Sequence, residues 1–207
     1  MKSFLSLTVA SLLGFASAAE VTAEGKCLAL AFSSGDENAA YQAGAMKGLV
    51  TSNMTQSDYA YDAVSGISGG ALNAVILANY TKGNEGFAAD AMEKFWKDAA
   101  NTKLYKSWFG GITRGLFWEG GLYNSAPLEN FLKKEFSDVA MHRKLDIGIV
   151  DVQTGQYRDF GDENITAPGT VADALYASMS FAGFFPPADV LGSYYFDGSA
   201  VWDIDIF

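Results

Sequence analysis

Ser68 stands at the centre of the pattern Gly66-x-Ser68-x-Gly70. One apolar run ends at Val64, just before the pattern, and another begins at Ala71, just after it. This arrangement predicts a tight turn between a strand and a helix, with the serine hydroxyl at its tip. Side chains two residues to either side of the serine would collide, which explains Gly66 and Gly70. The positive end of the following helix would face the serine, where acyl transfer builds up negative charge. The pattern thus predicts a nucleophile, with a glycine-rich turn that carries no chemistry as the alternative.

A serine nucleophile needs a base, and this chain offers few. Its one histidine, His142, precedes Asp197, whereas the α/β-hydrolase order places the histidine after the acid. We therefore expect His142 to be a surface residue. Asp197 follows the short apolar run 194–196 and precedes Gly198, which would let the backbone turn and approach the serine. Asp197 is therefore the best candidate base for a Ser68–Asp197 dyad, although an Asp-Gly pair taken alone is more often an ordinary turn.

The composition argues against several other classes of protein. The chain has one cysteine, Cys27, and one histidine, so neither an intrachain disulfide nor a Cys/His metal cluster is expected. Because Cys27 lies in an apolar run, we expect a buried and unreactive thiol. The net charge of -10 disfavours binding to nucleic acid and charge-driven binding to anionic membranes.

The N-terminus has the pattern of a secretory signal peptide over residues 1–18. Lys2 is followed by the apolar stretch 4–15 and then by Ala16-Ser17-Ala18, a small-residue cleavage site. An uncleaved anchor or an ordinary first helix is the alternative. We expect a secreted protein, or one of the secretory pathway, whose functional domain is 19–207. Three sequons would allow N-glycosylation there, at Asn53, Asn79 and Asn164.

Strands alternate with helices along the chain, which predicts a three-layer α/β sandwich with a mostly parallel central sheet. The exception is the segment 105–123, which is rich in aromatic residues and glycine and has no clean period. Its rings, among them Trp108, Phe109, Phe117 and Trp118, would either form an apolar cover over a lipid site or fill the core. Strands are expected at 26–32, 61–65, 145–152, 157–160 and 194–196, and helices at 39–50, 71–80, 86–99, 124–136 and 170–179.

Four blocks of the chain, in order, resemble the patatin-like phospholipases. They are the loop and helix start 34–44, the elbow 66–70, the stretch 177–187 that ends in Phe-Pro-Pro, and Asp197-Gly198-Ser199. The resemblance implies that Ser68 attacks an ester carbonyl of a lipid and that Asp197 takes its proton. It also implies no metal or organic cofactor. The oxyanion would be held by backbone amides around Ser34, Gly35 and Asp36.

The chain departs from the family pattern in two places. The family loop has three glycines, a basic residue and a further glycine, whereas this chain has Ser34, Gly35, Asp36, Asn38 and Ala39 there. Family domains also continue well past the Asp-Gly motif, so we expect the C-terminal part of the domain to be missing. Three functions stay open: a lipid acyl hydrolase (phospholipase or esterase) with possible contact to a lipid interface, a catalytically weak lipid-binding or storage relative, and an acyltransferase with the same dyad.

Overall fold

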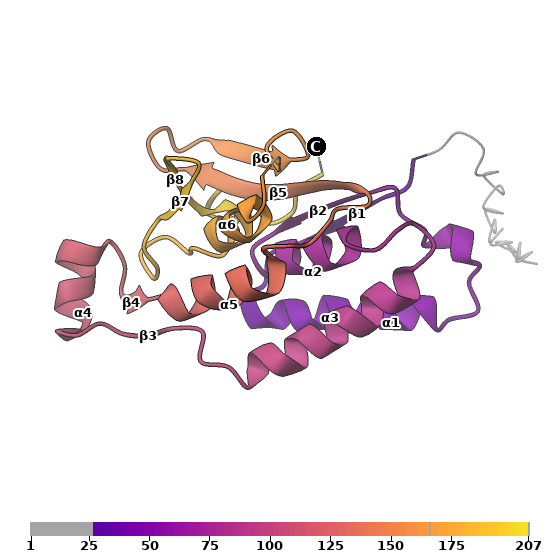
Figure 1. Cartoon of the computed structure of the whole chain (residues 1–207), viewed down its shortest axis with the longest axis horizontal. Coiled ribbons are helices and arrows are strands. Elements are labelled where there is room, and N and C mark those ends of the chain that lie inside the picture. Colours follow the sequence, from indigo (N-terminus) through magenta and orange to yellow (C-terminus); the bar gives the residue numbers. More distant parts are fainter. Residues whose placement is uncertain (1–26, 166, 207) are drawn as a thin grey trace, which may run out of the picture.

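A computed structural model describes residues 27–165 and 167–206. The expected signal peptide, residues 1–18, lies outside the described residues. The chain has the predicted α/β class, with a six-stranded sheet in the order β1-β2-β5-β8-β7 and with β6 paired to β5 (Figure 1). The strands are β1 (Ala29–Phe32), β2 (Ala63–Ile67), β5 (Lys144–Asp151), β6 (Tyr157–Gly161), β7 (Ala188–Val190) and β8 (Ser193–Asp197).

The central sheet is mostly parallel in strand direction. Strands β1, β2 and β5 pair in parallel, while β6 and β8 each pair antiparallel with β5. Strand β7 is antiparallel to β8 and therefore points the same way as β5. Within the described residues, only β6 and β8 run against the common direction.

Helices pack in layers beneath the sheet. Helices α2 and α6 pack directly on the strands, α1 and α3 lie below α2, and α5 lies below α6 (Figure 1). Helix α2 is buried along its whole length, as expected for a helix that is apolar on every side. The helices are α1 (Ala40–Val50), α2 (Gly69–Ala78), α3 (Glu85–Ala100), α5 (Ala126–Phe136) and α6 (Thr170–Ser178). No helix in the described part of the chain is long and apolar enough to cross a membrane.

Strands β2 and β8 meet end to end along one edge of β5, and this junction positions the candidate site. Ile67, the last residue of β2, pairs with Gly148, and Asp197, the last residue of β8, pairs with Ile149. The other edge of β5 is occupied by β6. Because β2 and β8 run in opposite directions, the residues that follow Ile67 and Asp197 leave the sheet at the same point.

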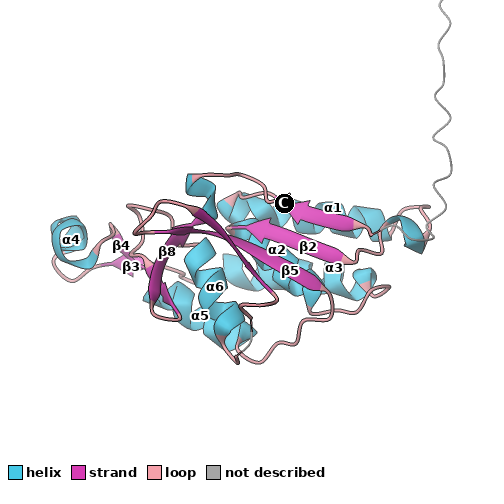
Figure 2. Cartoon of the chain, turned by 90° about the horizontal axis from the view of Figure 1, so that it is seen from above, coloured by secondary structure: helices cyan, strands magenta, loops and turns pink. Residues whose placement is uncertain are grey.

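The segment 105–123 forms a separate projection, which we call the aromatic arm. Its base is a two-stranded ribbon, β3 (Lys106–Ser107) with β4 (Tyr123–Asn124), and its tip holds helix α4 (Gly111–Arg114) followed by a π-helical turn, Gly115–Glu119. Figure 2, seen from above, shows α4 standing away from the sheet and its helices. The arm therefore does not fill the core, although Trp108 is half-buried within it.

Two of the sequence expectations are wrong at this level, and one is confirmed. Cys27 is exposed, not buried, because it lies ahead of β1, which begins only at Ala29. Strand β7 was not expected, since its residues, Ala188–Val190, follow two prolines and are too few to show alternation. His142 is a surface residue, as predicted.

Candidate active site

Ser68 is the single residue between β2 and α2. Its backbone has φ 56° and ψ -128°, a conformation that side chains rarely adopt, and the residue is only 3% exposed. A Cβ atom at Gly66 would lie 2.5 Å from the carbonyl oxygen of Gly70, and one at Gly70 would lie 2.3 Å from that of Ser33. Both distances are far below van der Waals contact, so the turn can close only with glycine at these positions.

Gly69 is a third required glycine, to which the sequence pattern assigned no role. A Cβ atom there would lie 2.4 Å from the carbonyl oxygen of Asp36 and 2.8 Å from Cβ of Ala39. The elbow and the 34–39 loop are therefore pressed together, backbone against backbone. The doubled glycine after Ser68 was the available signal for this close approach.

Asp197 is a buried carboxyl group next to Ser68, with 1% of its surface exposed. Its Oδ1 accepts a hydrogen bond from the amide of Ser199 at 2.8 Å, and its own amide donates to the carbonyl of Ser180 at 3.0 Å. Oδ2 has no hydrogen-bond partner among the described residues. Burial raises the pKa of Asp197 to about 6, although the amide of Ser199 and the nearby Ser68 hydroxyl favour the charged form and the charge of Asp36 opposes it.

Gly198 lets the chain pass close to β5, and this places Asp197 next to Ser68. A Cβ atom at residue 198 would lie 2.6 Å from the carbonyl oxygen of Gly148 and 3.1 Å from a side-chain atom of Ile67. The glycine therefore permits close approach to β5 and to the end of β2, not to the serine itself.

Ser178, at the end of α6, joins the elbow to the sheet. Its hydroxyl accepts a hydrogen bond from the amide of Ser68 at 2.8 Å and donates one to the carbonyl of Gly148 at 2.8 Å. The residue is fully buried. Sequence reasoning gave it no role of its own, although it lies in the small-residue stretch 177–187.

The three residues proposed for the oxyanion hole differ in what their amides do. The amide of Ser34 donates to the carbonyl of Asp203 at 2.7 Å and is therefore already in use. The amides of Gly35 and Asp36 have no acceptor among the described residues. Asp36 has a positive φ of 46°, and partial burial, followed by the charge of Glu37, raises the pKa of its carboxyl group. Two such amides next to the N-terminus of α2 could hold an anionic oxygen.

A chain of buried and partly buried hydrogen bonds holds this loop, and the sequence carries no sign of it. Asn73, on α2, donates to the carbonyl of Ala39 at 3.0 Å and to the side chain of Gln42 at 2.9 Å. Gln42 in turn donates to the carbonyl of Ser33 at 2.8 Å. The indole of Trp96 donates to Asn73 at 2.8 Å. The chain of hydrogen bonds thus runs from a wall of the pocket to both ends of the 33–39 loop.

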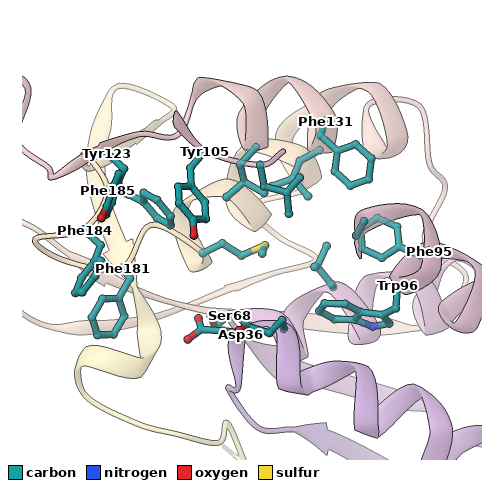
Figure 3. Close-up of a pocket in the computed structure, with 17 residues that line it drawn as sticks. Asp36, Ser68, Phe95, Trp96, Tyr105, Tyr123, Phe131, Phe181, Phe184 and Phe185 are labelled. Carbon is teal, nitrogen blue, oxygen red and sulfur yellow. The ribbon is translucent and has the colours of Figure 1, made fainter. Parts of the chain in front are cut away.

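Ser68 and Asp36 open into a cavity of about 430 Å³ whose lining is mostly apolar. Figure 3 shows these two residues at one side of the cavity, with Trp96, Phe95 and Phe131 along one wall and Phe181 and Phe184 towards the other. Apolar pockets with a few convergent polar groups are typical ligand sites. The further lining residues are Glu37, Leu72, Ala99, Leu104, Tyr105, Tyr123, Leu128, Leu132, Met179 and Phe185.

Comparison with known proteins identifies the family of this chain. The family model described as "Patatin-like phospholipase" matches residues 30–205. No curated protein matches the chain. Among solved structures, VipD from Legionella pneumophila is similar at 12% sequence identity and a TM-score of 0.47, over 88% of this chain and 47% of VipD. The chain thus spans about half the length of VipD. Because the family model covers most of its residues, the chain belongs to the patatin-like phospholipase family.

Proposed function

We propose that this protein is a secreted lipid acyl hydrolase in which Ser68 and Asp197 form a catalytic dyad. The observation that carries the proposal is a serine on a strained turn, beside a buried carboxyl group with one unpartnered oxygen among the described residues, at the wall of an apolar cavity. Phospholipids, galactolipids and simpler acyl esters all have an acyl chain that such a cavity suits. Secretion rests on the signal-peptide pattern of residues 1–18, and glycosylation on the sequons, of which Asn53 is exposed.

The proposed reaction has two half-reactions. Oγ of Ser68 attacks the ester carbonyl carbon, its proton passes to Oδ2 of Asp197, and the amides of Gly35 and Asp36 stabilise the oxyanion. The ester C–O bond then breaks, and the leaving alcohol takes the proton from Asp197. Water attacks the acyl-serine, gives a proton to Asp197 and releases the fatty acid, and this proton returns to Oγ of Ser68.

The pKa of Asp197 sets the expected pH dependence. A base must be deprotonated, so kcat/KM should rise with pH through a midpoint near the pKa of about 6. The effect on stability has the opposite direction. Because the folded-state pKa lies above the unfolded value of 3.8, the folded protein binds more protons between these two pH values, and the free energy of unfolding falls as pH rises through them. At pH 7 the buried charge costs up to about 3 kcal/mol.

The test is hydrolysis of a short-chain nitrophenyl ester and of phosphatidylcholine by the purified chain. Ser68→Ala and Asp197→Asn should each lower kcat/KM by at least about 1000-fold, and His142→Ala should not change it. Asp197→Asn should also raise the free energy of unfolding at pH 7, which separates lost chemistry from lost folding. Activity that persists in Ser68→Ala would reject the dyad.

Lipid binding without turnover is the second candidate function. The Asp36 carboxyl group favours it, because a negative charge close to Ser68 opposes formation of an oxyanion. A folded wild-type protein that binds lipid and hydrolyses neither substrate would support this function over the first. Hydrolysis in aqueous buffer would support the first function and argue against acyl transfer as the main reaction.

A further inference from the structure

The aromatic arm places its largest apolar side chains in solvent. Phe109 is 94% exposed, and Phe117 and Trp118 are each 74% exposed. Ile112 and Leu116, on the same short helical stretch, are more than half exposed. Single exposed apolar residues are common on protein surfaces, but a group of five on one projection marks a surface that another apolar phase would cover.

The arm has a fixed internal structure that directs these residues outward. The indole of Trp108 donates to the carbonyl of Gly121 at 3.0 Å and lies against Gly115, where a Cβ atom would be 2.8 Å from the ring. A Cβ atom at Gly115 would also lie 2.4 Å from the carbonyl oxygen of Gly121. Trp108 is therefore the inward-facing ring, and the close approach of the two glycines holds the other rings on the outside.

The arm is continuous with the mouth of the pocket. The amide of Leu122 donates to the carbonyl of Gly183 at 3.0 Å, and that of Tyr123 donates to the carbonyl of Phe184 at 2.9 Å. Phe184 and Tyr123 both line the pocket, and Phe184 is half exposed. The apolar surface thus runs from the tip of the arm to the opening of the cavity that holds Ser68.

The charge of the arm differs in sign from that of the whole protein. The arm together with the two residues before it, 103–123, carries three basic side chains and one acidic side chain, whereas the chain has a net charge of -10. Arg114 is paired with Glu119 at 2.7 Å, which leaves Lys103 and Lys106 at the base of the arm to meet phosphate oxygens. The net negative charge of the remainder opposes approach to a strongly anionic surface.

We propose that the aromatic arm docks on the surface of a zwitterionic phospholipid bilayer, with Phe109, Phe117 and Trp118 in the acyl region and Lys103 and Lys106 at the phosphates. Docking in this way brings the pocket mouth to the lipid. Aromatic and cationic side chains in this order are typical of helices that lie in a membrane interface. The inference deepens the proposed function, because it names the lipid surface from which the pocket takes its substrate.

The test uses phosphatidylcholine vesicles and the full chain with Ser68→Ala, so that binding is measured without hydrolysis. Phe117→Ser with Trp118→Ser should weaken vesicle binding at least tenfold in a flotation assay. The control, Phe87→Ser with Leu191→Ser, removes two apolar side chains of similar exposure, 67% and 71%, from elsewhere on the surface and should leave binding within twofold. Equal loss in both variants, or in neither, would overturn the proposal.

A second readout does not depend on the folding of the arm variant. Brominated phosphatidylcholine should quench tryptophan emission in the parent chain, and Trp118→Phe should remove most of that quenching. No quenching in the parent chain would overturn the proposal, as would a concentration-dependent dimer that Trp118→Ser converts to a monomer, because a second copy would then cover the arm. Ester hydrolysis is assayed separately, so absent turnover with arm-dependent binding rejects only the proposed function.

Discussion

The elbow around Ser68 and the 34–39 loop that faces it are both tight turns, but they are built from different residues. Each contains a residue other than glycine at positive φ, Ser68 at 56° and Asp36 at 46°. The two turns are in direct contact, since a Cβ atom at Gly69 would lie 2.4 Å from the carbonyl oxygen of Asp36. The elbow is surrounded by backbone, whereas Asp36 is only partly buried and keeps one side open. The surrounding backbone therefore restricts Gly66, Gly69 and Gly70 of the elbow to glycine. The open side of the loop, in contrast, leaves room for the charged side chain of Asp36.

This difference predicts where substitutions will be tolerated. At Gly70 no other residue fits, because the obstacle is the carbonyl oxygen of Ser33, which belongs to the backbone and cannot rotate away. At Asp36 the strain lies in one dihedral angle, and aspartate and asparagine adopt positive φ more readily than most residues. Substitutions in the elbow should thus disrupt folding and chemistry together, while those in the loop should alter chemistry alone.

The largest expected effect is that of Gly70→Ala. The new methyl group would push the elbow and the 33–36 backbone apart, so we expect a loss of more than about 2 kcal/mol in the free energy of unfolding and of about 100-fold in kcat/KM. Gly48→Ala is the matched control, since a Cβ atom there has open space around it within α1. That change should stabilise the protein by about 0.5–1 kcal/mol. Urea unfolding and ester hydrolysis of both variants make the comparison, and a tolerated Gly70→Ala would contradict it.

Asn73→Ala should have the next largest effect, because it removes the link between the pocket wall and the loop. It would leave the carbonyl of Ala39 and the side chains of Gln42 and Trp96 without this partner at a buried to partly buried site, a loss of about 1–3 kcal/mol. As a positioning residue, Asn73 should affect kcat more than KM. Trp96→Phe, which removes only the bond on the pocket side, should lower kcat less. If both variants change KM alone, the chain of hydrogen bonds does not position the loop.

Substitutions at Asp36 should change the pH profile with little change in stability. The negative charge of Asp36 raises the pKa of Asp197, so Asp36→Asn should move the midpoint of the pH–rate profile to lower pH. Asp36→Gly should move it in the same direction and should also ease the positive φ. Ester hydrolysis measured across the acidic and neutral range yields both midpoints. An upward movement, or none in either variant, would show that the charge of Asp36 does not influence the pKa of Asp197.

The smallest effect is expected for Ser34→Ala. The hydroxyl of Ser34 makes one exposed hydrogen bond, 3.2 Å from Asp203 Oδ1, while the link to Asp203 at 2.7 Å is made by the backbone and would persist. Stability should change by less than about 0.5 kcal/mol, and kcat should stay close to that of the parent chain. A clear loss of kcat would contradict this prediction. It would mean that the Ser34 hydroxyl either takes part in catalysis or is needed, beside the backbone hydrogen bond, to hold the loop.

Sequence patterns predict most of the fold and the elbow because these features depend on residues that are close together in the sequence. Apolar runs located five of the strands and the major helices, with boundaries displaced by a few residues. Strand β2 ends at Ile67 and helix α2 begins at Gly69, so the turn is a single residue, shorter than the apolar runs predict. Gly66 and Gly70 indicate from the sequence alone that the space around the serine is crowded.

The parts that were not predicted depend on contacts between distant residues. Ser178 and Asn73 are ordinary helix residues in the sequence, and only the packing of α6 and α2 shows what they bind. The use of the Ser34 amide by Asp203, 169 positions away, could not be inferred from a loop motif. The exposure of the aromatic arm was undecided because its glycines and rings fit either a core or a cover.

The backbone hydrogen bond between Ser34 and Asp203 has a consequence for the protein during its synthesis. Ser34 is among the first described residues to leave the ribosome, yet the partner of its amide, and Asp197 as well, are synthesised near the end of the described chain. A ribosome-bound chain that stops short of these residues therefore has Ser68, the proposed nucleophile, without Asp197, its proposed base, and without the contact that holds the facing loop. On this basis, the proposed hydrolytic activity would be acquired only after residue 203 has emerged, and the protein would stay inactive during its own synthesis.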